Sequence, residues 1–139
     1  MHVNSTLLDA NGPLARAICS RLPGTLAIYA FGSQIQGTQD ANSDLDLAVL
    51  VGGYADPLAL WKLSGQLADV AGCPVDLLDL RAASTVMQYQ IITTGQRLWA
   101  ADVQAGLFEC YVLSEKTALD TARGPLMRDI AKTGKIYAQ

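Results

Sequence analysis

The feature that most constrains the fold is a polar segment of defined length between two apolar runs. Residues 25–31 (TLAIYAF) form the first run, and residues 44–51 (DLDLAVLV) form a second run that carries two aspartates. Apolar runs of this length, bounded by glycine and other turn residues, predict buried strands. The segment between them opens with Gly32-Ser33, and ten further residues separate this pair from the first aspartate. The sequence therefore predicts two buried strands joined by a polar loop that begins with a glycine-serine turn.

The two aspartates of the second run are predicted to share one face of their strand. Asp44 and Asp46 are two residues apart, and strand side chains at that spacing point the same way. Neighbouring carboxylates repel each other and raise each other's pKa, so the pair serves little structural purpose. Mg²⁺ removes this repulsion and prefers a few carboxylate oxygens, completed by water and substrate phosphate. We predict that Asp44 and Asp46 bind Mg²⁺; the alternative is a solvated pair on an edge strand.

The turn before the loop supplies groups that suit a phosphate. Gly32 has no Cβ, so its backbone can approach a bulky anion. Residues 33–37 are predicted to form a helical turn whose N–H groups face the phosphate, and the Ser33 hydroxyl adds a donor. The alternative is a plain tight turn. A phosphate loop beside a metal-binding strand is typical of nucleotide chemistry, in which catalysis is mostly positioning and charge stabilisation.

The remaining periodicity predicts one α/β (α+β) domain over residues 1–139: a small mixed sheet with helices packed on one side and a C-terminal helical tail. Further strands are expected over 74–80 and 97–100. Helices are expected over 13–22, 56–70, 82–93 and 103–122, followed by a break at Gly124-Pro125, a short helix and a loose end.

Several residues outside the motif also carry predictions. Asp79 is expected to cap a helix or to be solvated. In the tail, apolar residues alternate with basic ones, so residues 103–139 are predicted to bind a partner protein. Five aromatic residues in apolar surroundings are predicted to be core residues rather than base-stacking groups: Tyr29, Trp61, Tyr89, Trp99 and Phe108.

Composition excludes several classes of function. The net charge is −3, which does not favour direct nucleic-acid binding. No apolar run reaches the roughly 18 residues of a membrane span. The N-terminal residues lack a basic segment followed by a long apolar stretch, so no signal peptide is predicted. Cys19, Cys73 and Cys110 are widely spaced and form no CxxC pair, so they are predicted to be buried free thiols of a cytoplasmic protein.

The motif resembles the signature of the polymerase-β-like nucleotidyltransferase superfamily. That signature is Gly-Ser, ten residues and Asp-x-Asp, and it matches Gly32-Ser33 and Asp44-Leu45-Asp46. The resemblance implies a third carboxylate on the following strand, which Asp76 in CPVDLLDL matches. It further implies two Mg²⁺ ions held by these carboxylates, with Asp76 helping to deprotonate the acceptor hydroxyl.

The chain more specifically resembles the minimal nucleotidyltransferases (MNT) that pair with HEPN-domain toxins. The similarity runs through the N-terminal helix, VDLLDL, GQRLWAAD, FECYV and RGPLMRDIAKTGKIY. It implies an antitoxin that uses ATP and Mg²⁺ to add AMP to a tyrosine of a HEPN ribonuclease toxin. The loop departs from the frequent Arg-x-Arg-Gly pattern, because Gln34 and Gln36 replace the arginines and bring no charge.

Two other functions share the same motif. One is an antitoxin that blocks its partner sterically, with little catalysis. The other is a small-molecule nucleotidyltransferase of the aminoglycoside-modifying type, which usually needs an additional substrate-binding domain. A chain of 139 residues has little room for that domain.

Overall fold

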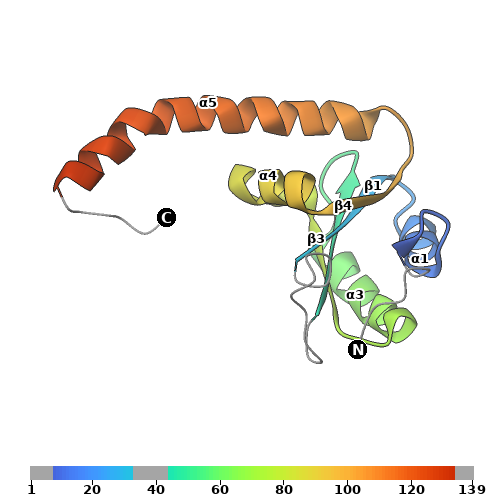
Figure 1. Ribbon diagram of the computed structural model, residues 1–139. Coiled ribbons are helices and arrows are strands. Elements are labelled where there is room, and N and C mark those ends of the chain that lie inside the picture. Colours follow the sequence, from blue (N-terminus) through green and yellow to red (C-terminus); the bar gives the residue numbers. More distant parts are fainter. Residues whose placement is uncertain (1–7, 33–43, 134–139) are drawn as a thin grey trace.

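A four-stranded mixed sheet with helices on both faces organises the chain (Figure 1). The computed structural model describes residues 8–32 and 44–133, with side chains described up to residue 121. The elements in chain order are α1 (Pro13–Arg21), β1 (Thr25–Phe31), β2 (Leu45–Val51), α3 (Pro57–Ala71), β3 (Val75–Asp79), the 3₁₀ helix η2 (Leu80–Ala82), α4 (Thr85–Thr94), β4 (Gln96–Ala100) and α5 (Gln104–Thr133).

The strand order is β3-β2-β1-β4, so the two strands predicted around the polar loop lie in the centre of the sheet. β1 pairs antiparallel with both β2 and β4, whereas β2 pairs parallel with β3. The parallel pair is possible because α3 carries the chain back to the starting end of β2 before β3 begins. The first residues of β2 and β3 therefore lie at the same end of the sheet.

Both faces of the sheet are covered, which corrects part of the prediction. The α/β class and the small mixed sheet are confirmed, but the helices do not pack on one side. Ile28 and Leu47 belong to a core with α1 and α3, whereas Tyr29 and Ala48 belong to a second core with α4 and α5. The central strands are apolar at nearly every position, so each of their faces needs a helical layer.

The ends of α3 follow the predicted local signals. The Asp56 side chain accepts a hydrogen bond from the Ala59 N–H at 3.0 Å, and Pro57 is the first helical residue. At the other end, Gly72 adopts the left-handed conformation with φ of 76°. An acidic N-cap, an N1 proline and a C-cap glycine are local determinants, which is why sequence alone located them.

The prediction of core aromatic residues holds for only some of the five. Tyr29 and Phe108 are buried, and Tyr89 and Trp99 are partly buried. Trp61 contradicts the prediction, because its side chain is 73% exposed. The buried stripe of α3 is made by Leu60, Leu63, Leu67 and Ala71. Trp61 lies one residue beyond the start of this stripe, and a step of about 100° around the helix turns its side chain outward.

Helix α5 is longer than predicted and lies only partly against the sheet. It runs without a break through Gly124-Pro125 to Thr133, so the predicted break there is wrong. Figure 1 shows the helix bending near its C-terminal end, as helices that contain proline commonly do. At about 1.5 Å per residue, its 30 residues span about 45 Å. Its buried side chains in the described part are Ala105, Phe108 and Val112, and the rest of the helix extends past α4 (Figure 1).

The three cysteines differ in their exposure to solvent. All three cysteines are free, but Cys110 is exposed, so the prediction of buried thiols is wrong for that residue. Cys19 and Cys73 are partly buried, and burial raises the pKa of the Cys19 thiol. In the described ranges, no helix combines the length and the apolar character that a membrane crossing requires.

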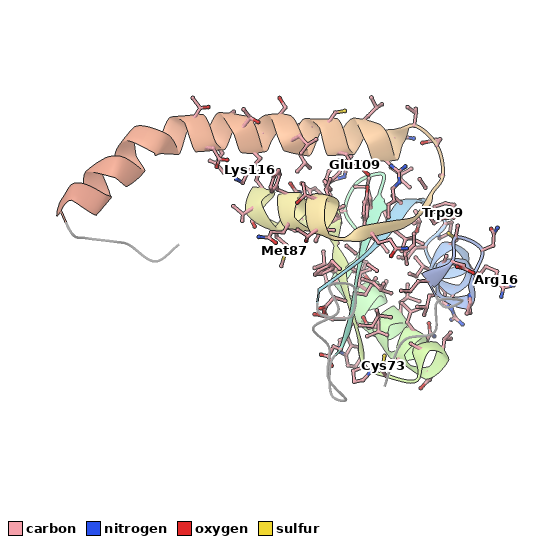
Figure 2. The ribbon with its side chains drawn as sticks, in the orientation of Figure 1. Arg16, Cys73, Met87, Trp99, Glu109 and Lys116 are labelled. Carbon is pink, nitrogen blue, oxygen red and sulfur yellow. The ribbon has the colours of Figure 1, made fainter. Side chains whose placement is uncertain are left out.

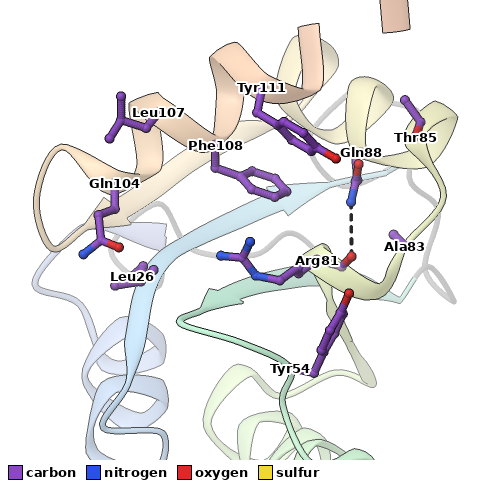
Figure 3. A pocket seen from close by; sticks show the side chains of 10 residues that line it. All are labelled: Leu26, Tyr54, Arg81, Ala83, Thr85, Gln88, Gln104, Leu107, Phe108 and Tyr111. Carbon is purple, nitrogen blue, oxygen red and sulfur yellow. Dashed lines mark hydrogen bonds between the residues drawn. The ribbon is translucent and has the colours of Figure 1, made fainter. Parts of the chain in front are cut away.

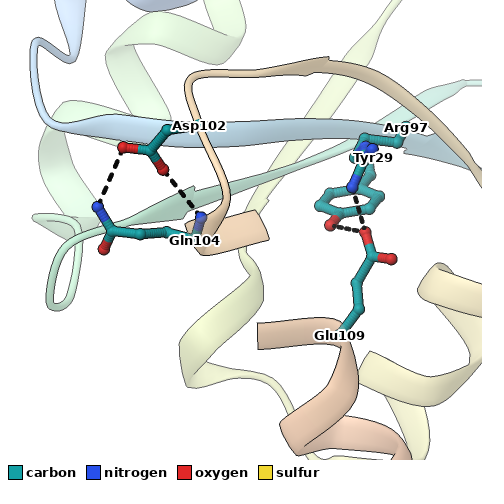
Figure 4. A network of polar contacts seen from close by, with 5 residues as sticks. All are labelled: Tyr29, Arg97, Asp102, Gln104 and Glu109. Carbon is teal, nitrogen blue, oxygen red and sulfur yellow. Dashed lines mark hydrogen bonds and ion pairs between the residues drawn. The ribbon is translucent and has the colours of Figure 1, made fainter. Parts of the chain in front are cut away.

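Polar contacts attach the first part of α5 to the sheet. The buried Tyr29 hydroxyl of β1 donates a 2.6 Å hydrogen bond to Glu109 Oε2, and Arg97 Nη1 of β4 lies 3.1 Å from the same oxygen (Figure 4). Burial and the neighbouring Glu109 carboxylate both raise the Tyr29 pKa well above its usual range. Further along the helix, Lys116 lies over the Tyr89 ring of α4, 4.9 Å from its centroid. Figure 2 shows Lys116 on the side of α5 that faces α4.

We predict that Tyr29→Phe lowers the free energy of unfolding by about 1–2 kcal/mol, because a buried hydrogen bond to a charged group is lost. Equilibrium unfolding in urea measures this change. Asp120→Ala is the control, because it removes the exposed i,i+4 pair with Lys116 and should cost at most about 0.5 kcal/mol. Equal effects of the two substitutions would show that the Tyr29 contact does not anchor α5.

Candidate active site

Two of the predicted carboxylates face each other across neighbouring strands. The parallel register of β2 and β3 sets Asp46 opposite Asp76, and the antiparallel register of β1 and β2 sets Phe31 opposite Asp46. Asp44 lies just before β2 and, at a spacing of two, is expected on the same face as Asp46. Neighbours of Asp46 in the strand point into the α1–α3 core, so Asp46 and Asp76 lie on the face that α4 and α5 cover.

The charges of this trio affect one another. The pKa of Asp46 is raised, first because the carboxyl is partly buried and then because Asp76 and Asp44 lie near it. Asp44 and Asp76 are themselves exposed to solvent. Partial burial and the two neighbouring carboxylates therefore all oppose ionisation of Asp46.

The residues present suit a hard divalent cation by their chemistry. Aspartate oxygens on adjacent strands are the ligands that Mg²⁺ takes together with substrate phosphate. In the part of the chain that the structure describes, no three His, Cys, Asp or Glu side chains gather closely enough to hold a metal ion as they stand. Like charges repel, so a bound cation is what would draw these carboxylates together.

Gly32 lies directly against the carboxylate of Asp46. Its φ is +83°, a left-handed conformation that side chains other than glycine rarely adopt. A Cβ built on Gly32 would overlap the Asp46 carboxylate. Both the backbone conformation and the contact with Asp46 therefore require glycine at this position. The predicted phosphate-binding Ser33 and the loop glutamines Gln34 and Gln36 lie outside the described residues.

Two hollows flank the row formed by Gly32, Asp46 and Asp76. The first, of about 480 Å³, lies on the β1 side and is lined by Phe31, Gly32 and residues of α4. The second, of about 640 Å³, lies between α3 and the edge strand β3, and Asp76 is part of its lining. Sequence reasoning missed the α4 contribution, because residues such as Val86 and Met87 look like ordinary amphipathic helix positions and carry no motif.

Asp79 has the structural role that was predicted for it. Its Oδ2 accepts a hydrogen bond from the Ala55 N–H at 2.8 Å, and its Oδ1 accepts one from the Arg81 N–H at 3.1 Å. These bonds cap η2 and hold the segment that precedes α3. The prediction that Asp79 caps a helix is therefore confirmed.

A third cavity, of about 540 Å³, lies at the opposite end of the sheet (Figure 3). Arg81 donates from Nε and Nη2 to the Val51 carbonyl at 3.3 and 3.1 Å, and its guanidinium lies 5.3 Å from the centroid of the Phe108 ring. Gln88 Nε2 donates to the Leu80 carbonyl at 3.0 Å. These bonds connect β2, η2, α4 and α5 at the end of the sheet that lacks the carboxylates.

A mixed sheet with carboxylates on neighbouring strands beside a glycine turn fits a nucleotidyltransferase. The chain belongs to the family described as polymerase beta, nucleotidyltransferase, whose model matches residues 15–104. It is 38% identical over 117 residues to the protein adenylyltransferase MntA of Shewanella oneidensis, covering 84% of each chain. This finding confirms the resemblance to the superfamily and to its minimal members.

Solved structures show the same similarity. A chain in the crystal structure of the toxin-antitoxin with AMP-PNP has a TM-score of 0.76 and 37% identity, covering 85% of this chain and 95% of that one. A chain in the structure of the tri-AMPylated Shewanella oneidensis HEPN toxin in complex with MNT antitoxin has a TM-score of 0.69 and 32% identity, covering 85% and 92% respectively. The polymerase-β-like fold is therefore shared over most of the chain.

We predict that Gly32→Ala lowers the free energy of unfolding by about 1–3 kcal/mol, because the new Cβ is strained at positive φ and displaces the Asp46 carboxylate. Thermal or urea unfolding measures the loss. Gly24→Ala is the matched control, since a Cβ there has nothing within 4 Å and should change stability by no more than about 0.5 kcal/mol. A Gly32→Ala protein as stable as the control would contradict the close approach to Asp46.

We predict that Asp46→Asn raises the melting temperature of the metal-free protein near neutral pH. Folding raises the Asp46 pKa, so the folded state binds this proton more tightly than the unfolded state and is weakened when the group ionises. Asparagine does not ionise. The advantage should shrink as the pH falls towards 3.8, the ordinary pKa of aspartate.

Melting curves across this pH range, recorded with a chelator present, measure the effect. Asp69→Asn, at an exposed position of α3, is the control and should show no comparable trend. A gain from Asp46→Asn that stays constant with pH would rule out charge repulsion as its cause.

Proposed function

We propose that this protein is the antitoxin of a HEPN/MNT toxin–antitoxin pair and acts as a Mg²⁺-dependent protein adenylyltransferase. It transfers AMP from ATP to a tyrosine of its HEPN toxin and releases pyrophosphate. The observation that carries this proposal is the register of Asp46 against Asp76 beside Gly32, in a chain 38% identical to a protein adenylyltransferase. A cytoplasmic location is part of the proposal, because the donor is ATP and the three cysteines are free.

The carboxylates divide the work in this proposal. Asp44, Asp46 and Asp76 hold Mg²⁺, which when bound neutralises phosphate charge and favours ionisation of the acceptor hydroxyl. Asp76, which is exposed at the sheet edge, orients the tyrosine hydroxyl and takes part in removing its proton. The strands hold these groups in fixed positions, which suits a reaction that depends on alignment.

The donor nucleotide is proposed to bind on the β1 side of the carboxylates. Gly32 and Ser33 hold the triphosphate, since the missing Cβ leaves the backbone accessible beside Asp46. The adjoining hollow of about 480 Å³ falls within the range of small-molecule pockets. Phe31 and Met87 give it apolar surface, and Gln90 gives it a polar group.

The helical tail over residues 103–139 is proposed to bind the toxin. Leu107, Tyr111 and Leu113 of α5 are exposed by 61%, 58% and 41%. Apolar side chains repeated along one extended helix are typical of a surface that a partner covers. This helix would also suit an antitoxin that acts by steric blocking. Steric blocking is therefore the second candidate function, after AMP transfer.

We predict that Asp44→Asn/Asp46→Asn lowers the rate of AMP transfer by at least about a hundredfold. Loss of a residue that only supports a metal ligand typically lowers metal affinity or activity about 10–100-fold, and this variant removes two ligands. The assay follows label from ATP to the co-purified HEPN partner in the presence of Mg²⁺. Chelation of Mg²⁺ should stop transfer by the intact protein. Asp69→Asn should transfer AMP at the normal rate.

Size-exclusion chromatography then tests whether the inactive variant still binds the partner, as we expect from α5. Cell survival separates the two modes of action. An inactive variant that still neutralises the toxin at normal expression would show that steric blocking suffices and would count against a catalytic role.

A further inference from the structure

The surface between α3 and β3 holds the hollow of about 640 Å³ that ends at Asp76. We call it the Trp61 groove, and the residues that matter for it are Trp61, Ser64, Gly65, Ala68, Val75 and Asp76. β3 is the edge strand of the sheet in the described part of the chain. In the described ranges, no strand pairs with the outer edge of β3, so a partner can reach the groove from that edge.

Trp61 is the most unusual member of this groove. Its side chain is 73% exposed, although tryptophan loses more than most residues by remaining in water. Ser64, Gly65 and Ala68 follow it along the helix, and a Cβ built on Gly65 has nothing within 4 Å. A large aromatic residue beside a floor of small side chains is typical of an anchor at a protein interface.

The geometry of the reaction identifies what approaches from this side. Across the sheet, the order is Gly32 at the end of β1, then Asp46 on β2, then Asp76 on β3. In phosphoryl-type transfer, the attacking oxygen and the leaving group lie roughly in line on opposite sides of the phosphorus. With the donor held near Gly32, the acceptor has to enter from the β3 edge of the sheet, and the groove runs beside this edge on the α3 face.

We propose that the Trp61 groove binds the segment of the partner protein that carries the acceptor tyrosine. Trp61 packs against an apolar part of that segment on the α3 face, and the segment passes around the edge of β3 so that the tyrosine hydroxyl reaches the Asp76 carboxylate on the other face. From Trp61 to Ala68 the helix rises about 10 Å, which corresponds to about three residues of extended chain. The inference rests on the proposed adenylyltransferase function and adds the surface that presents the substrate to it.

The test is steady-state AMP transfer to the full-length HEPN partner with labelled ATP and Mg²⁺. Trp61→Ala should raise the KM for the partner by at least about tenfold, with kcat within about twofold, since loss of an aromatic anchor weakens docking. The KM for ATP should not change. Val70→Ala is the control, because Val70 is an exposed apolar residue on the opposite side of the same helix, about 2.5 turns further along, and should leave all three values unchanged.

A second variant fills the groove instead of emptying it. Gly65→Phe places a ring where the structure leaves space, so the fold should tolerate it, as a melting curve verifies. It should raise the KM for the partner as Trp61→Ala does. Gly24→Phe, at another position with open space around the glycine, should not.

The outcomes separate this inference from the function on which it rests. No AMP transfer by the intact protein would overturn the proposed function. Normal transfer by the intact protein, combined with an unchanged KM for the partner in both groove variants, would overturn the Trp61 groove alone. A rise in the KM for ATP instead of the KM for the partner would also overturn it, because the groove would then serve the donor.

Discussion

The parallel pairing of β2 with β3 is the constraint on which the rest of the site depends. It sets Asp46 against Asp76, so two carboxylates lie side by side at one end of the sheet and one of them is partly withdrawn from water. A protein that needs only stability gains nothing from such a pair. In the proposed function, a bound cation and triphosphate offset this repulsion, and Gly32 has no side chain that would fill the space beside Asp46.

Strand β1 connects this site with α5, the helix that we propose for partner binding. β1 ends at Phe31, directly before Gly32, and Tyr29 of that strand holds Glu109 of α5. The glycine turn and the base of α5 are therefore parts of one hydrogen-bonded unit. At the far end of the sheet, Arg81 joins Val51 to the α4 and α5 layer, so both ends of this face are held by buried or half-buried polar groups.

The residues of the candidate site were predicted from spacing and residue chemistry, and the strand register sets two of them, Asp46 and Asp76, opposite each other. A glycine-serine turn and two aspartates in an apolar strand pointed to phosphate and metal, and the caps at Asp56 and Gly72 set the limits of α3. The failures concern contacts between distant segments. The apolar central strands did not reveal that helices cover both faces, and the apolar neighbours of Trp61 did not reveal that its side chain points to solvent.

The sequence by itself determined the strands, the caps of α3 and the glycine-serine turn with its two aspartates, because these depend on residues close together in the chain. Only the tertiary structure decided that β3 lies beside β2, that α4 walls the hollow next to Gly32, and that Trp61 opens a groove leading to Asp76. Strand neighbours and helix faces are selected by burial and pairing between segments far apart in sequence. No local pattern encodes that selection, because each partner supplies only half of the contact.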